Sequence, residues 1–229
     1  MALVPAGVPV SRNYPANTYR YRASSHFLYL VGVGVPGAVL YVDGDRSVLL
    51  LPDRDPLDAL WHGALPSPAD FGRALGLEVR SLSQLSSLLM ERIPALTPCM
   101  YAQGLSSVRA VRAARPLQAK EGDQALAQAM VALRLSHDAA ALHEIRRAVA
   151  VSVTAHRAGM AATSTSKVER EVCAAMEAVI GREGFDLAYG SIVTVHGEVL
   201  HNHEHHHPLR PGDLLLADVG AESDTGYAS

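Results

Sequence analysis

The sequence predicts a mixed α/β (α+β) fold built in two parts, and three observations support this prediction. Short apolar runs separated by Gly, Pro and Asp fill the first half of the chain. Long stretches with helical spacing occupy the second half, and two further extended runs close it. The composition becomes polar near residue 115, in ARPLQAKEGDQ, which is the best candidate for a boundary between the two parts.

Strand signals are strongest in the first part. The runs 26–33, 38–44 and 47–53 are apolar and rich in residues that favour strands. Asp43-Gly44 separates the last two runs and favours the positive φ angles of a tight turn, so these two runs are expected to form a hairpin. Three helical segments are then expected, over 55–63, 67–75 and 81–92.

Helical spacing dominates the beginning of the second part. The first helix is expected to place four apolar residues on one face: Leu142, Ile145, Val149 and Val153. A second helix is expected from about 166 to 180, because Ser166 and Glu169 have the spacing of a capping box. Extended runs at 189–195 and 213–220 complete the order helix, helix, strand, loop, strand.

The composition restricts the class of protein and its partners. Hydrophobic residues make up 48% and charged residues 19% of the chain, as in soluble globular proteins. A net charge of −3 without a basic block argues against nucleic acid or an anionic membrane as the main partner. The apolar runs are too short to span a bilayer, and the N-terminus lacks the positive region of a signal peptide. Cys99 and Cys173 share no motif, so we expect reduced thiols in a cytoplasmic protein.

The stretch GVGVPG at residues 32–37 matches the letters of the dinucleotide fingerprint G-x-G-x-x-G. That fingerprint must be followed by a helix whose N-terminus receives the pyrophosphate. Here Pro36 interrupts the motif and the strand-like run AVLYV follows. We therefore predict a glycine-rich turn between strands and no site for NAD.

Five histidines lie within the segment HNHEHHHP at residues 201–208. Imidazole is a common metal ligand, but adjacent side chains point in different directions, and a rigid site needs ligands from separate elements. A solvated loop that binds metal only adventitiously is therefore favoured for four of them: His203, His205, His206 and His207. His201 differs, because it directly follows GEVL and is expected where a strand end opens into a cleft.

Asp218 ends the apolar run LLLAD, which has the pattern of a buried strand. Carboxylates at the ends of such strands often face a ligand crevice, and a buried charge must be paired or bind a cation. The residues alone leave two interpretations open, a capped structural aspartate and a metal ligand. One carboxylate does not make a hydrolytic metal site, because two adjacent divalent ions need several more ligands.

The segment GDLLLADVGAESDTGYAS resembles the first metal-ligand segment of the Xaa-Pro aminopeptidase (aminopeptidase P) and prolidase family of pita-bread metallopeptidases. The positions that match the pattern of this family are Asp218, Gly220, Gly226 and Tyr227. RNYPANTYRYRASSHFLYLVG and LPDRDPLDALWHG resemble the N-terminal domain of the family, and LRLSHDAAALHEIRRAVAVSVTAH resembles the first helix of its catalytic domain. Ser136 departs from the basic or aromatic residue that is usual there.

The resemblance implies a domain plan for the whole chain. Residues 1–120 would form the aminopeptidase P-like α/β N-terminal domain, followed by a connecting helix at 121–135. Residues 136–229 would form the first half of a pita-bread metallopeptidase domain, which is then truncated. Uncovered apolar faces on such a half imply a homo-oligomer or a complementing C-terminal half.

The resemblance also implies a chemistry. The family hydrolyses the bond between an N-terminal residue and proline with a metal-activated water held by two divalent ions, manganese first, then cobalt or zinc. Asp218 matches the first metal ligand and supplies a hard oxygen donor. His201 matches a histidine that approaches the substrate, and Trp61 an aromatic residue that lines the substrate pocket from a neighbouring subunit.

The remaining ligands of the family, a second aspartate, a histidine and two glutamates, would belong to sequence beyond residue 229. The 229-residue chain is therefore expected to be inactive unless it is completed. The alternative is a non-catalytic truncated relative that acts as an oligomerisation or interaction module.

Overall fold

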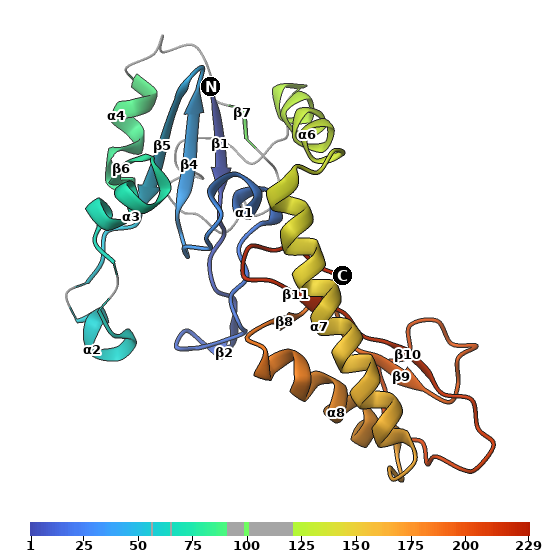
Figure 1. The fold of residues 1–229 in the computed structure, drawn as a ribbon. Coiled ribbons are helices and arrows are strands. Elements are labelled where there is room, and N and C mark those ends of the chain that lie inside the picture. The colour runs from blue at the N-terminus through green and yellow to red at the C-terminus, as the bar shows by residue number, and fades with distance from the viewer. Residues whose placement is uncertain (56, 65, 91–98, 101–120) are drawn as a thin grey trace. The chain divides into compact units, whose positions relative to one another are not determined.

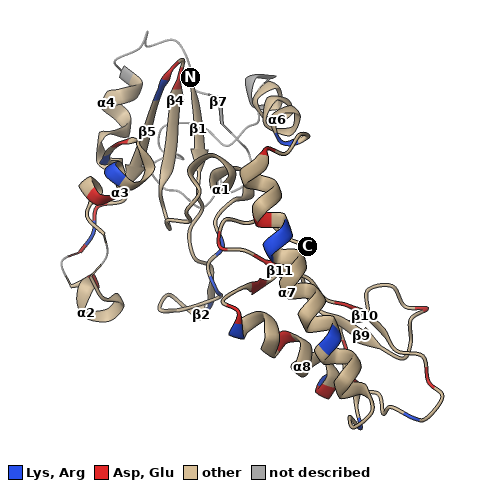
Figure 2. Ribbon diagram, in the orientation of Figure 1, with Lys and Arg blue, Asp and Glu red and all other residues tan. Residues whose placement is uncertain are grey.

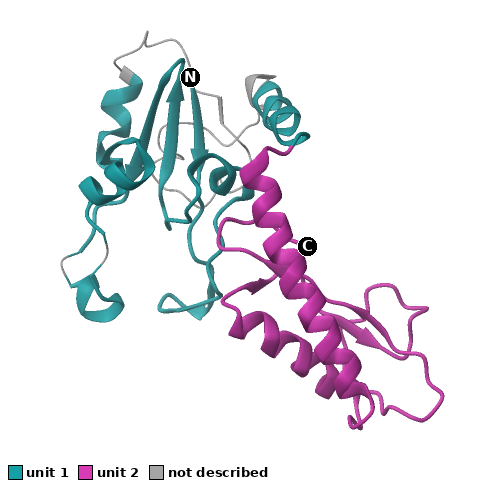
Figure 3. Ribbon diagram, viewed as in Figure 1, with its two compact units in different colours: residues 1–136 teal, residues 137–229 magenta. Residues whose placement is uncertain are grey.

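The structure is a computed structural model that describes residues 1–55, 57–64, 66–90, 99–100 and 121–229 (Figure 1). The chain divides into two compact units, Met1–Ser136 and His137–Ser229 (Figure 3). The boundary predicted near residue 115 lies outside the described residues. Acidic and basic residues are interspersed along the described parts of both units (Figure 2).

A five-stranded sheet with the order β6-β5-β4-β1-β7 forms the centre of unit 1. Its strands are β1 (Ala2–Pro5), β4 (Val39–Asp43), β5 (Arg46–Leu51), β6 (Glu78–Ser81) and β7 (Cys99–Met100). Strand β4 is antiparallel to both β1 and β5, whereas β7 and β6 are parallel to their neighbours. The predicted hairpin is confirmed, because Asp43 pairs with Arg46 and Gly44 between them has a φ of 58°. Strands β2 (Ser11–Tyr14) and β3 (Asn17–Thr18) form a separate small hairpin.

The helical segments among the described residues of unit 1 run from 3 to 14 residues in length. They are α1 (Ser25–Val31), α2 (Asp58–His62), α3 (Pro68–Leu75), the 3₁₀ turn η1 (Leu82–Gln84), α4 (Leu85–Met90) and α6 (Glu121–Arg134). The helices expected within 55–63, 67–75 and 81–92 are therefore present over their described residues. Helix α3 begins with a capping box, in which the Ser67 hydroxyl accepts from Asp70 N and the Asp70 carboxylate accepts from Ser67 N.

The prediction of a strand at 26–33 is wrong, because most of these residues lie in helix α1 (Ser25–Val31). Phe27, Leu28 and Val31 are buried at helical spacing, and Gly32 ends the helix with a φ of 80° while its N–H donates to Leu28 O. A run of this length that is apolar throughout shows no periodicity, so the sequence could not separate a helix from a strand. The glycine-rich turn at 32–37 therefore lies between helix α1 and strand β4, and the prediction that it lies between two strands is wrong.

Helices cover both faces of the sheet of unit 1. Alternate residues of β4 face opposite sides of the sheet and belong to two different hydrophobic clusters. Tyr41 packs with Leu85 and Leu88 of α4, whereas Leu40 packs with Phe27 of α1. Helix α6 contacts helix α1 through Arg134, whose Nη1 lies 3.1 Å from Nδ1 of His26. Burial lowers the pKa of His26, and the Arg134 charge lowers it further. A neutral His26 can therefore accept the hydrogen bond of the guanidinium.

Two helices and four short strands make up unit 2: α7 (Ala139–Thr163), α8 (Glu169–Arg182), β8 (Asp186–Leu187), β9 (Ile192–Thr194), β10 (Leu216–Asp218) and β11 (Ala221–Glu222). Strand β10 is antiparallel to β9, with Asp218 opposite Ile192, and β11 is antiparallel to β8. The predicted order of helix, helix, strand, loop, strand is present, although both long strands are shorter than expected.

Helix α7 packs against helix α8 through small residues. The buried residues of α7 are Ala141, Ala148, Ser152, Ala155 and Gly159. A Cβ atom placed on Gly159 would lie 2.6 Å from Met176 Sδ, so the two helices approach closely at this point. The predicted apolar face of α7 is therefore not its buried face, since Val149 and Val153 are 43% and 45% exposed. Hydrophobic periodicity finds an apolar stripe but does not show that a neighbouring helix covers it.

The capping box predicted at Ser166 and Glu169 is also wrong. Helix α8 begins at Glu169, its N-cap residue is Val168, and no side chain caps it in the predicted way. The Lys167 N–H instead donates to Glu171 Oε2 over 2.7 Å. The side chain of Glu169 does not cap the helix and instead accepts hydrogen bonds from the end of β9 and from the loop between β9 and β10.

Of the helices that the structure describes, none combines the length and the apolar character needed to cross a membrane.

Candidate functional site: a strand-end carboxylate and a histidine loop

Asp218 is the last residue of strand β10 and lies on its exposed side. Residues of β10 alternate, so Ala217 and Val219 face the core of unit 2, whereas Leu214 and Leu216 are 88% and 40% exposed. The expectation of a buried strand is therefore wrong, because one side of β10 is exposed. The carboxylate of Asp218 is consequently open to a ligand on this exposed side.

Tyr189 orients the carboxylate of Asp218, because the phenol OH of Tyr189 donates a hydrogen bond to Asp218 Oδ1. Burial raises the pKa of Tyr189 to about 12, and the bond to Asp218 contributes in the same direction. The phenol therefore keeps its proton at neutral pH and remains a donor. Sequence reasoning missed Tyr189, because a tyrosine just before a strand has no pattern that distinguishes it from a packing residue.

The packing around Gly220 explains why a glycine follows Asp218 two residues along the chain. A Cβ atom at this position would lie 2.8 Å from Tyr189 Cε1 and 3.0 Å from its OH. Gly220 O accepts a hydrogen bond from Ala188 N over 2.9 Å, which fixes the two segments at this distance. Glycine thus allows the Tyr189 ring to pack against the backbone and reach Asp218.

Asp218 has the donor chemistry of one ligand of a metal site. Within the residues that the structure describes, no group of three or more His, Cys, Asp or Glu side chains is arranged to hold a metal ion. Asp218 offers a hard carboxylate oxygen of the kind that divalent cations such as Mn²⁺ prefer. Asp218 is therefore an oriented carboxylate that stands alone among the described residues of unit 2, without the further ligands that a metal site needs.

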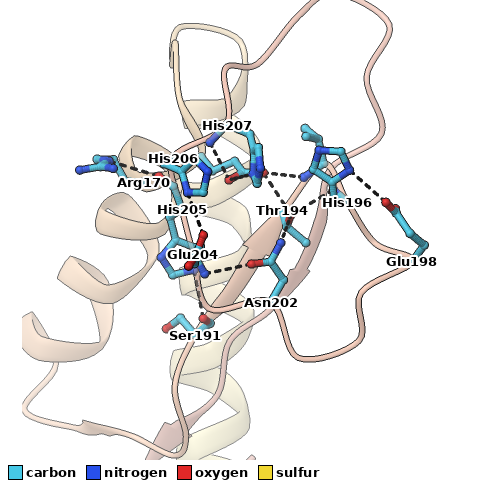
Figure 4. A network of polar contacts seen from close by, with 12 residues as sticks. Arg170, Ser191, Thr194, His196, Glu198, Asn202, Glu204, His205, His206 and His207 are labelled. Atoms are coloured by element: carbon cyan, nitrogen blue, oxygen red, sulfur yellow. Dashed lines mark hydrogen bonds and ion pairs between the residues drawn. The ribbon is translucent and has the colours of Figure 1, made fainter.

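The loop at residues 195–207, here called the histidine loop, is held to the start of helix α8 (Figure 4). Glu169 has no exposed side-chain surface, and its carboxylate accepts four hydrogen bonds. Oε1 accepts from Val195 N over 2.8 Å and from Thr194 Oγ1 over 3.1 Å. Oε2 accepts from His207 N over 3.1 Å and from His207 Nδ1 over 3.0 Å.

The pKa of Glu169 lies below its ordinary value. Burial by itself would raise the pKa, but the hydrogen bonds from Val195, His207 and Thr194 to the ionised form outweigh it. Glu169 is therefore a carboxylate at neutral pH. Since a carboxylate only accepts, His207 Nδ1 must carry a proton.

The expected solvated loop is wrong for two of its histidines. His207 is held by Glu169, and His205 Nε2 lies 3.1 Å from the carbonyl oxygen of Ser191. His203 and His206 are exposed, and His206 Nδ1 lies 3.3 Å from Glu204 Oε2. The rings of His206 and His207 also pack together, with centroids 4.2 Å apart.

His201 lies in a turn in the middle of the histidine loop, and its side chain is exposed. The expectation that His201 lies at a strand end is therefore wrong, because strand β9 (Ile192–Thr194) ends well before it; His201 lies in the same unit as Asp218. Trp61 lies in unit 1, in helix α2, and is 78% exposed.

Cys173 is buried, and burial together with the charge of Glu177 raises the pKa of its thiol to about 11, so the thiol is protonated at neutral pH.

Comparison with known families gives two matches that follow the chain in order. Residues 1–98 match the aminopeptidase P N-terminal domain, and residues 143–229 match metallopeptidase family M24. The chain therefore carries a match to the aminopeptidase P N-terminal domain followed by a match to metallopeptidase family M24. The family resemblance and the fold class predicted from the sequence are both confirmed.

Individual relatives with similar sequences are Xaa-Pro aminopeptidases. Xaa-Pro aminopeptidase 1 of Streptomyces coelicolor is 29% identical over 99% of this chain and 49% of its own length. A probable Xaa-Pro aminopeptidase of Pyrenophora teres is 28% identical over 91% of this chain and 46% of its own length. The chain thus spans about half the length of the curated relatives that it matches.

Solved structures of the family superpose on the chain. Aminopeptidase P from E. coli in its low-pH form gives a TM-score of 0.82 at 27% identity, covering 99% of this chain and 56% of that one. Proline aminopeptidase P II from Yersinia pestis gives a TM-score of 0.78 at 26% identity, covering 100% of this chain and 58% of that one. The described residues of this chain therefore share the fold of these aminopeptidase P structures.

Proposed function

We propose that this chain is the N-terminal portion of a metal-dependent Xaa-Pro aminopeptidase, which hydrolyses the bond between an N-terminal residue and proline. One observation carries the proposal. Asp218 lies on the exposed side of β10, its carboxylate is oriented by Tyr189, and the segment around it matches metallopeptidase family M24. An exposed carboxylate held by a neutral phenol is suited to a divalent cation, because its second oxygen remains available for the cation.

Asp218 is proposed as the first ligand of a site for two divalent ions, manganese first and cobalt or zinc as alternatives. When bound, such ions supply an activated water for attack on the peptide bond. The contribution of Tyr189 is to hold one carboxylate oxygen, which fixes the direction of the other. The remaining ligands would come from a second half that joins this one.

His201 is proposed to contact the substrate amide and to stabilise it as it reacts. Its exposed side chain in the middle of the histidine loop is available for such a contact. Trp61 is proposed to line the substrate pocket of a neighbouring subunit, and its 78% exposure leaves the indole free for that contact. The substrate would be a peptide with proline in the second position.

The partner is proposed to be a second copy of the chain or a complementing C-terminal half. Large apolar side chains of unit 2 are exposed, and they would be covered in such an assembly. They include Val149, Val153, Met160, Leu214 and Leu216. The cytoplasmic location and the absence of nucleic-acid and membrane partners remain predictions from the composition.

The test compares three preparations in the presence of Mn²⁺ with an Xaa-Pro peptide as substrate. The purified 229-residue chain, freed of contaminating peptidases, should not hydrolyse it. A protein that carries this chain together with a second half supplying the other ligands should do so, and its Asp218→Asn variant should not. Hydrolysis by the 229-residue chain alone would show that no essential ligand is missing from it.

A second candidate function is a non-catalytic oligomerisation or interaction module. The exposed apolar side chains of unit 2 favour it, because they suit an interface as well as they suit a second half-domain. This candidate predicts a stable assembly without hydrolysis even when the other metal ligands are supplied. Metal-dependent hydrolysis by the completed protein excludes it.

A further inference from the structure

A single buried carboxylate joins the two ends of the histidine loop. Val195 is the first residue of the loop and His207 is the last, and the N–H groups of both donate to Glu169, over 2.8 and 3.1 Å. Glu169 is the first residue of helix α8, which is anchored in the core of unit 2. The carboxylate therefore ties a long exposed loop to a rigid element at both ends.

A second set of bonds leads from this carboxylate into the middle of the loop. Thr194 Oγ1 donates to Glu169 Oε1 and accepts from Asn202 Nδ2 over 3.2 Å and from His196 N over 3.0 Å. Asn202 Oδ1 in turn accepts from Glu204 N over 3.0 Å. The side chain of Asn202 is thus held on both sides, and Figure 4 shows its contact with Thr194.

Asn202 is the immediate neighbour of His201. The imidazole of His201 is exposed, so the direction in which it points depends on the backbone that carries it. Fixing Asn202 fixes that backbone. The bonds Glu169–Thr194–Asn202 therefore end beside His201, the residue that the proposed function places against the substrate.

We propose that Glu169 is a positioning residue: its carboxylate closes the histidine loop at both ends and, through Thr194 and Asn202, holds His201 in place for the substrate. The part concerning His201 rests on the proposed function, whereas the closure of the loop does not. Glutamine cannot replace this carboxylate. Each oxygen of Glu169 faces two donors, so the amide NH₂ of a glutamine must meet donors on one of the two sides.

The loop closure is tested in the 229-residue chain by hydrogen exchange. Glu169→Gln should speed the exchange of at least one of the Val195 and His207 amides about tenfold, because the amide that faces the new NH₂ group loses its acceptor. The matched control is Glu171→Gln, two residues along the same helix, where the side chain is exposed and bound to Lys167 N. Glu171→Gln should leave both loop amides unchanged. Equal exchange in the wild type and Glu169→Gln would overturn the proposal.

A second variant keeps the proposal testable if Glu169→Gln does not fold. Asn202→Ala removes only the bonds of one half-buried side chain. It should speed the exchange of the Glu204 amide about tenfold while leaving Val195 and His207 protected, since their bonds to Glu169 remain. Protection of Glu204 that is unchanged in Asn202→Ala would overturn the inner part of the network.

The positioning of His201 is tested in the protein completed by a second half, with an Xaa-Pro peptide as substrate. Thr194→Val removes the hydroxyl that joins Glu169 to Asn202, whereas Thr194→Ser keeps it. Thr194→Val should lower kcat about tenfold with little change in KM, because a displaced His201 affects the reacting amide more than ground-state binding. Thr194→Ser should retain the wild-type kcat.

The outcomes separate the two proposals. If wild-type and Thr194→Val proteins hydrolyse the peptide equally well, the positioning role is wrong and the proposed function stands. If the completed wild-type protein does not hydrolyse it, the proposed function fails together with the role of His201. The hydrogen-exchange results then still decide whether Glu169 closes the loop.

Discussion

Replacing Gly220 by alanine tests the packing that orients the candidate ligand Asp218. The new Cβ atom would lie 2.8 Å from Tyr189 Cε1 and 2.8 Å from the carbonyl oxygen of Ser229. Neither is the flexible end of a side chain, so the Tyr189 ring or the backbone must move. Gly220 is not among the glycines with positive φ, so the alanine meets no backbone strain and the effect is purely steric.

The magnitude follows from two opposing terms. Overpacking of a tight contact costs roughly 1–3 kcal/mol. The lower entropy of alanine in the unfolded chain returns roughly 0.4–1 kcal/mol. We therefore expect a net loss of about 1–2 kcal/mol in the free energy of unfolding of unit 2, which is roughly a 5- to 30-fold change in the unfolding equilibrium.

Hydrogen exchange of the Ala188 amide is the most direct assay, because Ala188 N donates to Gly220 O. Gly181→Ala is the matched control. Gly181 lies in helix α8, and a Cβ atom there would have no atom within 4 Å. The control should stabilise the helix by roughly 0.5–1 kcal/mol. If Gly220→Ala protects the amide as Gly181→Ala does, the proposed packing of Tyr189 against Gly220 is refuted.

Three further predictions concern the ligand, the loop and the exposed helix face. Tyr189→Phe should weaken Mn²⁺ binding by the completed protein about 10- to 100-fold in a metal titration, because the phenol no longer orients Asp218; unchanged affinity would exclude that role. The folded-state pKa of Glu169 is depressed, so its stabilisation is complete above the unfolded pKa of about 4.3 and is lost as the pH falls below that value. Exchange of the Val195 amide, corrected for its intrinsic rate, should therefore increase in acid, and a flat profile would contradict this. Replacing Val149 and Val153 together by serine should reduce self-association of the 229-residue chain in sedimentation velocity, and an unchanged distribution of species would show that this face is not involved.

The parts of the fold that the sequence predicted correctly have strong local signals. Asp43-Gly44 specified a hairpin because only a few residues tolerate the backbone of its turn. Helices α7 and α8 were predictable from their length, since a repeat with helical period over many residues has few alternatives. The segment 26–33 had neither advantage, because a short run that is apolar throughout suits a helix and a strand equally.

The orientation of helix α7 was not predictable from its pattern. Its larger apolar residues form the more obvious stripe, but the close approach of α8 at Gly159 requires small residues at the contact. Packing between two helices is a property of both sequences together. A hydrophobic pattern in one of them therefore does not identify the covered face.

The candidate site was predictable to a different degree at each residue. Asp218 could be singled out because a carboxylate at the end of an apolar run is unusual. Glu169 was misassigned, since its position at the start of a helix suggested a cap, whereas its partners Thr194 and His207 lie far away along the chain. Tyr189 was missed for the same reason, because its contact with Asp218 exists only after β9 and β10 pair.

The assignment of Asp218 as the first metal ligand is the central claim, and one measurement tests it most directly. Mn²⁺-dependent hydrolysis of an Xaa-Pro peptide should be compared between a complete protein containing this chain and its Asp218→Asn variant. We expect the Asp218→Asn variant to lose at least about a hundredfold in activity, since loss of a metal ligand costs more than loss of a group that orients one. Full activity in the Asp218→Asn protein would contradict the assignment.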